Sequence, residues 1–337
     1  MTPDSIGTPE QLRDPNYTPP LAKALPLGIQ HVVAMFVSNV TPAIIVAGAA
    51  GFGFGSNSAE FPELLYMIQM AMLFAGIASL LQSVGAGPVG ARLPIVQGTS
   101  FAYIPIMIPL VAGKGIDGLA ALFSGVILGG VFHILLGTVI GRIRYALPPL
   151  VTGLVVLMIG LALVEVGIQY AAGGAPKIGT ADYGSLHSWS TALIVVAITL
   201  ALNLFAKGML AVSAVLVGIV VGYGYALITG LLSLSDISGS WNTAAVFALP
   251  DPFRYGFEFS IAAVLGFCLM AFVSTVETVG DVSAITKSGA GREATDREIA
   301  GDAKLRLEPV RPPGAPTNHR EAIVQATVSL TDQVRAR

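Results

Sequence analysis

The chain has 337 residues, of which 54% are hydrophobic and only 11% are charged, and its formal net charge is −2. Soluble domains carry about 25% charged residues, so this composition excludes an ordinary soluble protein. The small net charge gives no basis for a nucleic-acid partner, and the single cysteine, Cys268, excludes a disulfide framework.

Long runs without Asp, Glu, Lys or Arg follow one another along most of the chain. A helix that crosses a bilayer needs about 20 mainly apolar residues. The sequence therefore predicts an all-α polytopic membrane protein with about eight spans. We place these spans at 26–50, 61–84, 94–112, 116–140, 146–170, 189–207, 209–233 and 258–285.

The parts outside the spans differ in composition. Residues 1–24 form a polar, proline-bearing segment without the short apolar core of a signal peptide. Residues 25–285 are expected to form the transmembrane domain. Residues 286–337 contain nine of the 18 Lys and Arg residues and no span, which predicts a disordered cytoplasmic tail.

The distribution of positive charge predicts the orientation in the cell membrane. If the N-terminus is cytoplasmic, six Lys and Arg residues lie on the inner side before the last span ends and three lie outside. Cytoplasmic loops carry an excess of positive residues, so we expect a cytoplasmic N-terminus.

Three GxxxG pairs fall within the predicted spans or at the end of one. Small residues at this spacing let helix backbones approach closely. The pairs are Gly125 and Gly129, Gly137 and Gly141, and Gly218 and Gly222.

The third span, LPIVQGTSFAYIPIMIPLVAG, contains Pro94, Gly98, Pro105 and Pro109. Proline removes a backbone donor and clashes with the preceding turn, so a continuous helix is disfavoured. A broken segment is tolerated in a bilayer only where protein or a water-filled cavity surrounds it, and in transporters such segments commonly hold the substrate. A proline-kinked helix is the alternative.

The eighth span ends in FVSTVETVGD, which places Glu277 and Asp281 four residues apart and hence on one helix face. A carboxylate within the membrane is costly and marks a functional site by default. Two neighbouring carboxylates disfavour double ionisation, so the pair is suited to bind a proton together with a hydrogen-bonding ligand. The alternative is that both residues mark the cytoplasmic end of the span.

Further polar and aromatic residues fall inside the apolar spans. His31 is a candidate for organising the site or handling protons, and a neutral imidazole that bonds a neighbouring helix is the alternative. His133 has the same packing explanation. Ser100, Phe101 and Ala102 follow the break in the third span. Phe101 offers a stacking face, and free backbone groups beside it suit the edge of a flat heterocycle such as a nucleobase. Another small polar solute is an equal alternative.

The sequence resembles the nucleobase–cation symporter-2 family, also called nucleobase–ascorbate transporters, over about residues 20–303. The resemblance rests on PLGIQHVVAMF (26–36), LPIVQGTSFAYI (93–104) and FVSTVETVGDVSA (272–284), and GREATDREIAGDA (291–303) is also similar. It implies 14 spans in two inverted repeats of seven, divided into a core and a gate domain, homodimers, and proton-coupled uptake without a cofactor or metal.

The resemblance also implies roles for individual residues. Glu277 would hydrogen-bond the nucleobase, and Asp281 matches the acidic position of the purine branch. Phe101 and Ala102 would line the substrate beside Ser100, and His31 would shape the site. ETVGD in place of the EHVGH typical of uracil carriers favours xanthine or urate.

The chain departs from the family pattern after the eighth span. We expect only the first repeat and the first span of the second, because the family's Asn-x-Gly motif has no counterpart after Ala303. The final segment resembles a shifted reading frame or a fusion, so we expect a truncated family member. The leading interpretation is a proton-coupled xanthine or urate transporter. The alternatives are a uracil permease, a non-transporting membrane fragment and, from the paired acids, an intramembrane hydrolase; we expect no enzyme.

Overall fold

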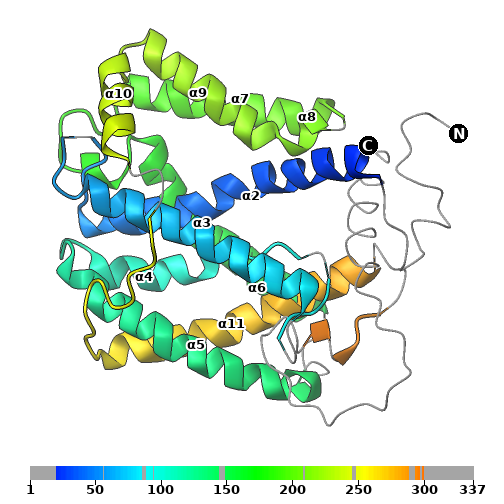
Figure 1. The fold of residues 1–337 in the computed structure, drawn as a ribbon. Helices are drawn as coiled ribbons and strands as arrows, with labels where there is room; N and C mark the ends of the chain where they lie inside the picture. The colour runs from blue at the N-terminus through cyan, green and yellow to red at the C-terminus, as the bar shows by residue number, and fades with distance from the viewer. Residues whose placement is uncertain are drawn as a thin grey trace, which may run out of the picture.

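A computed structural model describes residues 20–299, except for 56, 86–88, 94, 144–148, 208, 245–247, 288–292 and 297. The described part is a bundle of helices (Figure 1). Its α-helices are α2 (Leu21–Ala50), α3 (Phe61–Val84), α4 (Ile104–Val111), α5 (Asp117–Ile143), α6 (Pro149–Ala171), α7 (Leu186–Phe205), α8 (Met209–Val212), α9 (Ala214–Ile228), α10 (Leu234–Thr243) and α11 (Ile261–Ile285). Two short 3₁₀ helices are η1 (Phe101–Tyr103) and η3 (Ala175–Lys177).

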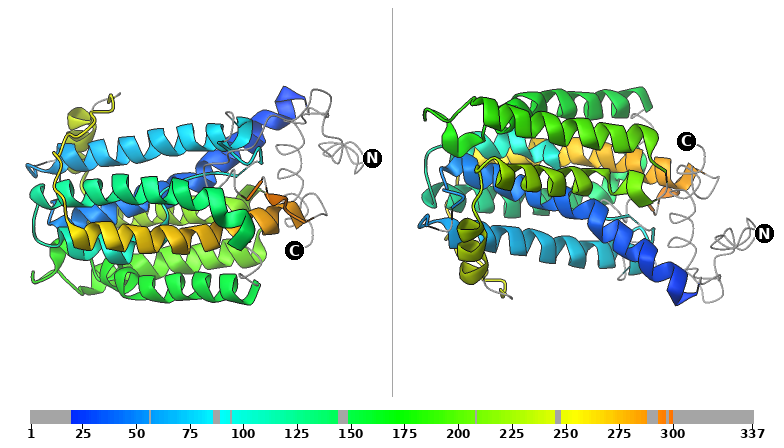
Figure 2. Two further views of the ribbon diagram at one scale, coloured as in Figure 1. Left: turned by 90° about the horizontal axis from the view of Figure 1, so that it is seen from below. Right: turned by 90° about the horizontal axis from the view of Figure 1, so that it is seen from above.

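Six of these helices, α2, α3, α5, α6, α7 and α11, are long and apolar enough to cross a membrane. They cover six of the eight predicted spans, and Figure 2 shows the long helices lying alongside one another. The predicted span 209–233 contains α8 and the shorter apolar helix α9. An all-α polytopic membrane protein is therefore confirmed.

The third predicted span is interrupted, as its prolines and glycine indicate. Residues 95–100 are not helical, and an apolar helix follows from Phe101 to Val111. The broken segment is thus the observed form rather than a continuous kinked helix.

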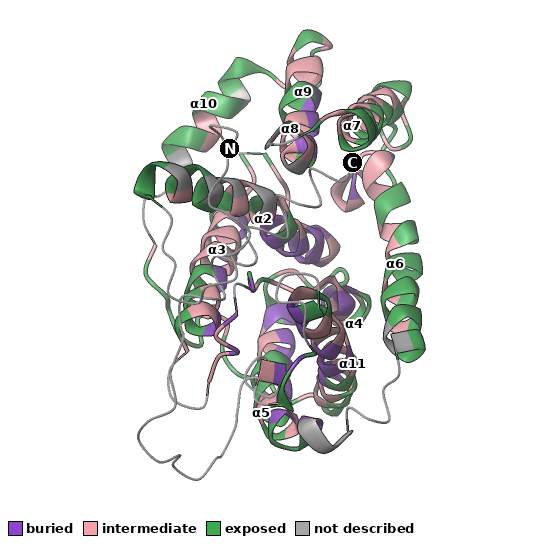
Figure 3. Cartoon of the chain, turned by 90° about the vertical axis from the view of Figure 1, so that its right-hand side faces the viewer, coloured by how far each residue is buried: buried purple, intermediate pink, exposed green. Residues whose placement is uncertain are grey.

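The buried core is not spread evenly over the bundle. Its largest cluster joins α2, α3, α4, α5 and α11, and it includes Phe52, Leu119, Leu122 and Phe267. Figure 3 shows this burial on one side of the bundle, whereas α6 and α7 are mostly exposed. Apolar residues exposed over a whole helix are typical of a membrane-facing surface.

Close helix packing on glycine brings α5 against α11. A Cβ atom at Gly125 would lie 2.7 Å from the Phe267 ring, and one at Gly129 would lie 2.6 Å from Phe267 Cβ. Only glycine admits this approach, so the GxxxG prediction is confirmed here. The packing sets the position of α11, which carries Glu277.

The glycine pair on α9 packs in the same way against α7. A Cβ at Gly222 would lie 2.5 Å from a methyl group of Val195, and one at Gly218 would collide with the neighbouring Thr199 hydroxyl. This pair is also confirmed, and the third pair stays a prediction.

The turn between α4 and α5 closes the end of α2. The last carbonyl groups of a helix have no partner inside it. Here the N–H groups of Gly113 and Gly115 donate to the carbonyl oxygens of Ala49 and Ala50, at 3.1 and 2.9 Å. Both glycines have positive φ values of 68° and 59°, which a residue with a side chain rarely adopts. The turn thereby fixes α4 beside α2.

Part of the expected C-terminal tail packs onto the bundle. Ala294 and Ile299 are 5% and 1% exposed, and they belong to a cluster with Leu93 and Val279. The packed part of the chain therefore extends beyond the predicted boundary at residue 285. Residues 300–337, which hold the rest of the expected tail, lie outside the described residues.

Candidate functional site

The broken segment 95–100 receives its hydrogen bonds from two neighbouring helices. The Oδ1 atom of Asn39 on α2 accepts from the N–H of Thr99 at 3.1 Å. Ser79 on α3 pairs with both backbone groups of Gln97: its Oγ accepts from the N–H at 2.9 Å and donates to the carbonyl at 3.3 Å. Polar backbone at membrane depth needs such internal partners.

Glycine is required where this segment passes α2. A Cβ atom at Gly98 would overlap the side-chain oxygen of Asn39. Ser100 then caps the helical turn that follows, because its Oγ accepts from the N–H of Ala102 at 3.2 Å. The sequence GTS thus connects the extended segment to the start of a helix.

A hydrogen bond joins the broken segment to α11. The Ser100 hydroxyl donates to Oε2 of Glu277 at 3.3 Å, across 177 residues of sequence. Glu277 is half-buried. The predicted pairing of the third and eighth spans is therefore present as a direct side-chain contact.

A cavity of about 430 Å³ lies at this junction. Its lining comes from α2, the broken segment, η1, α5 and α11. The lining residues are Met35, Ser38, Asn39, Ile95, Val96, Gln97, Gly98, Thr99, Ser100, Phe101, Tyr103, His133, Ser274, Glu277, Thr278 and Asp281. Pockets that enclose small ligands span about 300–1,000 Å³, so the size suits a small heterocycle.

Four of the six predicted site residues line this cavity: Ser100, Phe101, Glu277 and Asp281. Asp281 is exposed, whereas Glu277 is half-buried. Ala102 is 2% exposed and lies behind the lining, with its N–H bonded to Ser100.

His31 lies elsewhere on α2, about two helical turns before Asn39, and is not among the lining residues. It is half-buried. The structure thus brings the predicted third-span and eighth-span residues together but not His31. Its role stays a prediction.

Several lining residues were not predicted. On α11 a sequence signal existed, because Ser274, Glu277, Thr278 and Asp281 recur at helical spacing and share one face. Packing was the favoured explanation for His133, and the structure places it in the lining of the cavity.

The cavity combines three kinds of chemistry. Glu277 is an acceptor for ligand N–H groups, Phe101 and Tyr103 offer aromatic faces, and Gln97 adds an amide. Among the described residues, no group of three or more His, Cys, Asp and Glu side chains could hold a metal ion. The arrangement suits a flat, polar, uncharged ring.

A second cavity of about 440 Å³ lies between α2, α3, α4 and α5. It is mostly apolar, and it shares Thr99 with the first cavity. The loop 251–256, which precedes α11, forms part of its lining.

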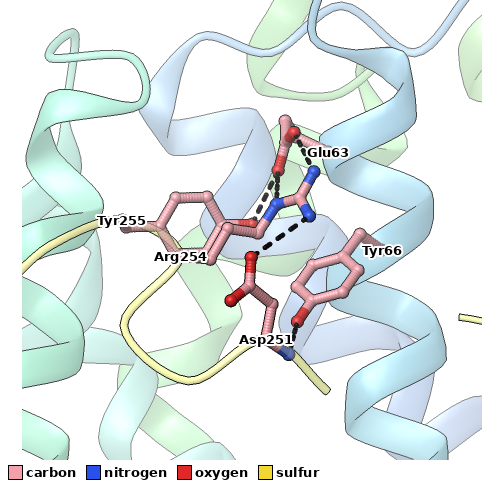
Figure 4. Close-up of polar contacts among 5 residues, drawn as sticks. All are labelled: Glu63, Tyr66, Asp251, Arg254 and Tyr255. Atoms are coloured by element: carbon pink, nitrogen blue, oxygen red, sulfur yellow. Dashed lines mark hydrogen bonds and ion pairs between the residues drawn. The ribbon is translucent and has the colours of Figure 1, made fainter. Parts of the chain in front are cut away.

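Figure 4 shows how this loop is fastened to α3. The Arg254 guanidinium donates to both carboxylate oxygens of Glu63, at 2.9 and 2.7 Å, and lies 4.3 Å from the centre of the Tyr66 ring. The Tyr255 hydroxyl donates to Glu63 at 3.0 Å, and the Asp251 N–H donates to the Tyr66 hydroxyl oxygen at 2.8 Å. The hydrogen bond to Glu63 raises the pKa of Arg254, and burial raises the pKa of Tyr255. This cluster fixes the start of α11 relative to α3.

Comparison with known proteins agrees with this architecture. The sequence profile Xan_ur_permease, described as "Permease family", matches residues 22–297. A Clostridium perfringens protein named as a purine permease is 35% identical over 266 residues, which cover 79% of this chain and 55% of that protein.

Two further relatives have names that state a ligand. The uric acid permease PucJ of Bacillus subtilis is 33% identical over 280 residues, covering 82% of this chain and 59% of PucJ. The xanthine permease XanQ of Escherichia coli K12 is 32% identical over 272 residues, covering 79% of this chain and 56% of XanQ. The match thus spans a little over half the length of each relative. The chain belongs to this permease family, the nucleobase–ascorbate transporters that its motifs resemble.

Proposed function

We propose that this chain binds an oxidised purine, xanthine or urate, and carries it across the cell membrane. The observation that carries the proposal is the Ser100–Glu277 hydrogen bond at a ligand-sized cavity that Phe101 also lines. The names of the relatives, which are purine, uric acid and xanthine permeases, support the substrate class.

Recognition follows from complementary hydrogen bonding. The purine presents ring N–H groups to the Glu277 carboxylate, and hydrogen bonds to a charged acceptor are stronger than those between neutral groups. Phe101 packs on the ring face. Ser100 donates a hydrogen bond to Glu277 and also caps the helical turn that begins at Phe101. Ser100 therefore positions both the carboxylate that bonds the ring edge and the aromatic side chain that packs on the ring face.

Uptake is coupled to a proton in this proposal. Glu277 and Asp281 lie one helical turn apart, and two neighbouring carboxylates disfavour double ionisation. A proton bound at this pair and a purine bound at Glu277 therefore influence each other. His31 is proposed to shape the site from α2, and Ala102 to support the lining from behind.

The membrane arrangement belongs to the same proposal. The N-terminal segment 1–24 and residues 286–337 lie in the cytoplasm, and residues 25–285 form the membrane domain. The positive charge of the predicted inner loops supports this orientation. A homodimer is proposed from the family resemblance alone.

Equilibrium binding of radiolabelled xanthine to the purified chain in lipid nanodiscs tests the proposal. Glu277→Gln should weaken binding roughly 10- to 100-fold, because a hydrogen bond to a charged group is lost. Glu165→Gln is the matched control, since Glu165 is an exposed acid on another span and does not line the cavity.

The two variants give a clear decision. Equal binding by Glu277→Gln and wild type would refute the assigned site. Excess unlabelled uracil should compete poorly with xanthine, and competition as strong as that of xanthine would favour a uracil carrier instead. Uptake by proteoliposomes that contain the same chain tests transport separately from binding.

A further inference from the structure

Asn39 has an unsatisfied polar group at the cavity. The residue is 2% exposed, and its Oδ1 is occupied by the N–H of Thr99. Its Nδ2 atom is buried and has no hydrogen-bond partner within the described part of the chain. Buried polar groups nearly always have partners, so each exception needs an explanation.

The position of this group points to a ligand. Asn39 lines the same cavity as Glu277 and Phe101, but from α2 rather than α11. Its orientation is fixed, because the bond to Thr99 leaves the amide nitrogen as the remaining end. The Asn39 side chain cannot shift toward the broken segment, because the backbone of Gly98 already lies close against it.

We infer that Asn39 is a specificity-determining residue that donates its free amide N–H to a ring carbonyl oxygen of the bound purine. The inference rests on the proposed function and extends it. Glu277 accepts from a ring N–H, and Asn39 supplies the donor that the neighbouring carbonyl requires. Oxidised purines present N–H and C=O groups side by side, so this donor and acceptor select them over unoxidised rings.

The shielding of Nδ2 from solvent has a consequence for binding. A ligand oxygen reaches it only when the 95–100 segment moves enough to admit one atom. Ligand binding should therefore alter hydrogen exchange at the Thr99 amide, whose acceptor is Asn39 Oδ1.

Two substitutions separate the two functions of the side chain. Asn39→Asp keeps an acceptor for Thr99 and removes the donor, whereas Asn39→Ala removes both. Thr41→Val is the matched control on the same helix. The Thr41 hydroxyl donates to the carbonyl of Val37 in its own helix at 2.7 Å, and Thr41 does not line the cavity. Thermal unfolding confirms that each variant is folded before binding is measured.

Binding is measured with xanthine and with two purines that each keep one of its carbonyl groups, hypoxanthine and 2-hydroxypurine. Asn39→Asp should weaken xanthine and one of the single-carbonyl purines about 3- to 10-fold, the loss expected for one hydrogen bond, and leave the other unchanged. An equal loss for all three ligands would mean that Asn39 is structural only, and no loss would also overturn the inference.

The wild-type chain separates failure of this inference from failure of the proposed function. If wild type binds xanthine and the Asn39 variants bind all three ligands as wild type does, only the inference is overturned. If wild type binds none of the purines, the proposed function is overturned and this inference with it.

Discussion

Replacing Gly129 by alanine should destabilise the protein, whereas the same change at Gly130 should not. The new Cβ at position 129 would lie 2.6 Å from Phe267 Cβ and 3.2 Å from its backbone carbonyl carbon. Carbon atoms pack best at about 3.5–4.0 Å, so α5 and α11 must separate by about 1 Å. At Gly130 nothing lies within 4 Å of the added atom.

The expected change in unfolding free energy follows from two opposing contributions. Overpacking of this kind costs about 1–3 kcal/mol, whereas replacing a helical glycine by alanine gains about 0.5–1 kcal/mol. We therefore expect Gly129→Ala to lower the unfolding free energy by about 1–2 kcal/mol. Gly130→Ala should leave it unchanged or raise it by the propensity gain alone.

The single cysteine provides the assay. Cys268 follows Phe267 on α11 and is half-buried, so a thiol-reactive dye reports the unfolding of this helix. A difference of 1 kcal/mol shifts the melting temperature by about 1–2 °C in a chain of this length, because the unfolding entropy grows with the number of residues. Circular dichroism at 222 nm serves as a check that does not depend on access to the thiol. A Gly129→Ala variant that melts at or above Gly130→Ala would refute the proposed α5–α11 packing.

The remaining predictions concern the loop before α11 and the α7–α9 contact. Arg254→Lys keeps the charge but loses the two-point bond to Glu63, which should lower the unfolding free energy by about 1 kcal/mol. The melting temperature should then fall by about 1–2 °C, and unchanged melting would contradict the contact. Burial raises the folded-state pKa of Tyr255, so its contribution should be full below about pH 10 and disappear as the pH rises toward the folded-state value. Melting curves at increasing pH should show a larger loss of stability in wild type than in Tyr255→Phe. Gly218→Leu should destabilise the protein, whereas Gly224→Leu, where a Cβ meets nothing within 4 Å, should not; equal melting of the two would refute the α7–α9 packing.

Much of the fold could be predicted because its causes are local. A long run of apolar residues has few alternatives to a spanning helix, and six such runs form helices that are long and apolar enough to cross a membrane. Pro94, Gly98 and Pro105 likewise indicate the break in the third segment before any neighbour is known. The family resemblance and the cost of a carboxylate in the membrane placed Ser100 and Glu277 at one site, but their direct hydrogen bond was seen only in the structure.

What could not be predicted depends on contacts distant in sequence. Asn39 is one polar residue in an apolar run, and its partner Thr99 is 60 positions away. Ala294 and Ile299 are buried against Leu93 and Val279. The sequence around Ala294 and Ile299 does not indicate this contact. The family motif assigned His31 to the site, but in the structure His31 lies on α2 about two helical turns before Asn39.

The most direct test of the central claim asks whether a purine occupies the cavity beside Glu277. Thr278 lines that cavity and is half-buried, so a cysteine placed there by Thr278→Cys, with Cys268→Ser to remove the native thiol, reports access to it. We predict that saturating xanthine or urate slows maleimide labelling of this cysteine, and that Glu277→Gln abolishes the protection. Labelling at the same rate with and without purine, in a chain shown to be folded, would contradict the assignment of this cavity as the binding site.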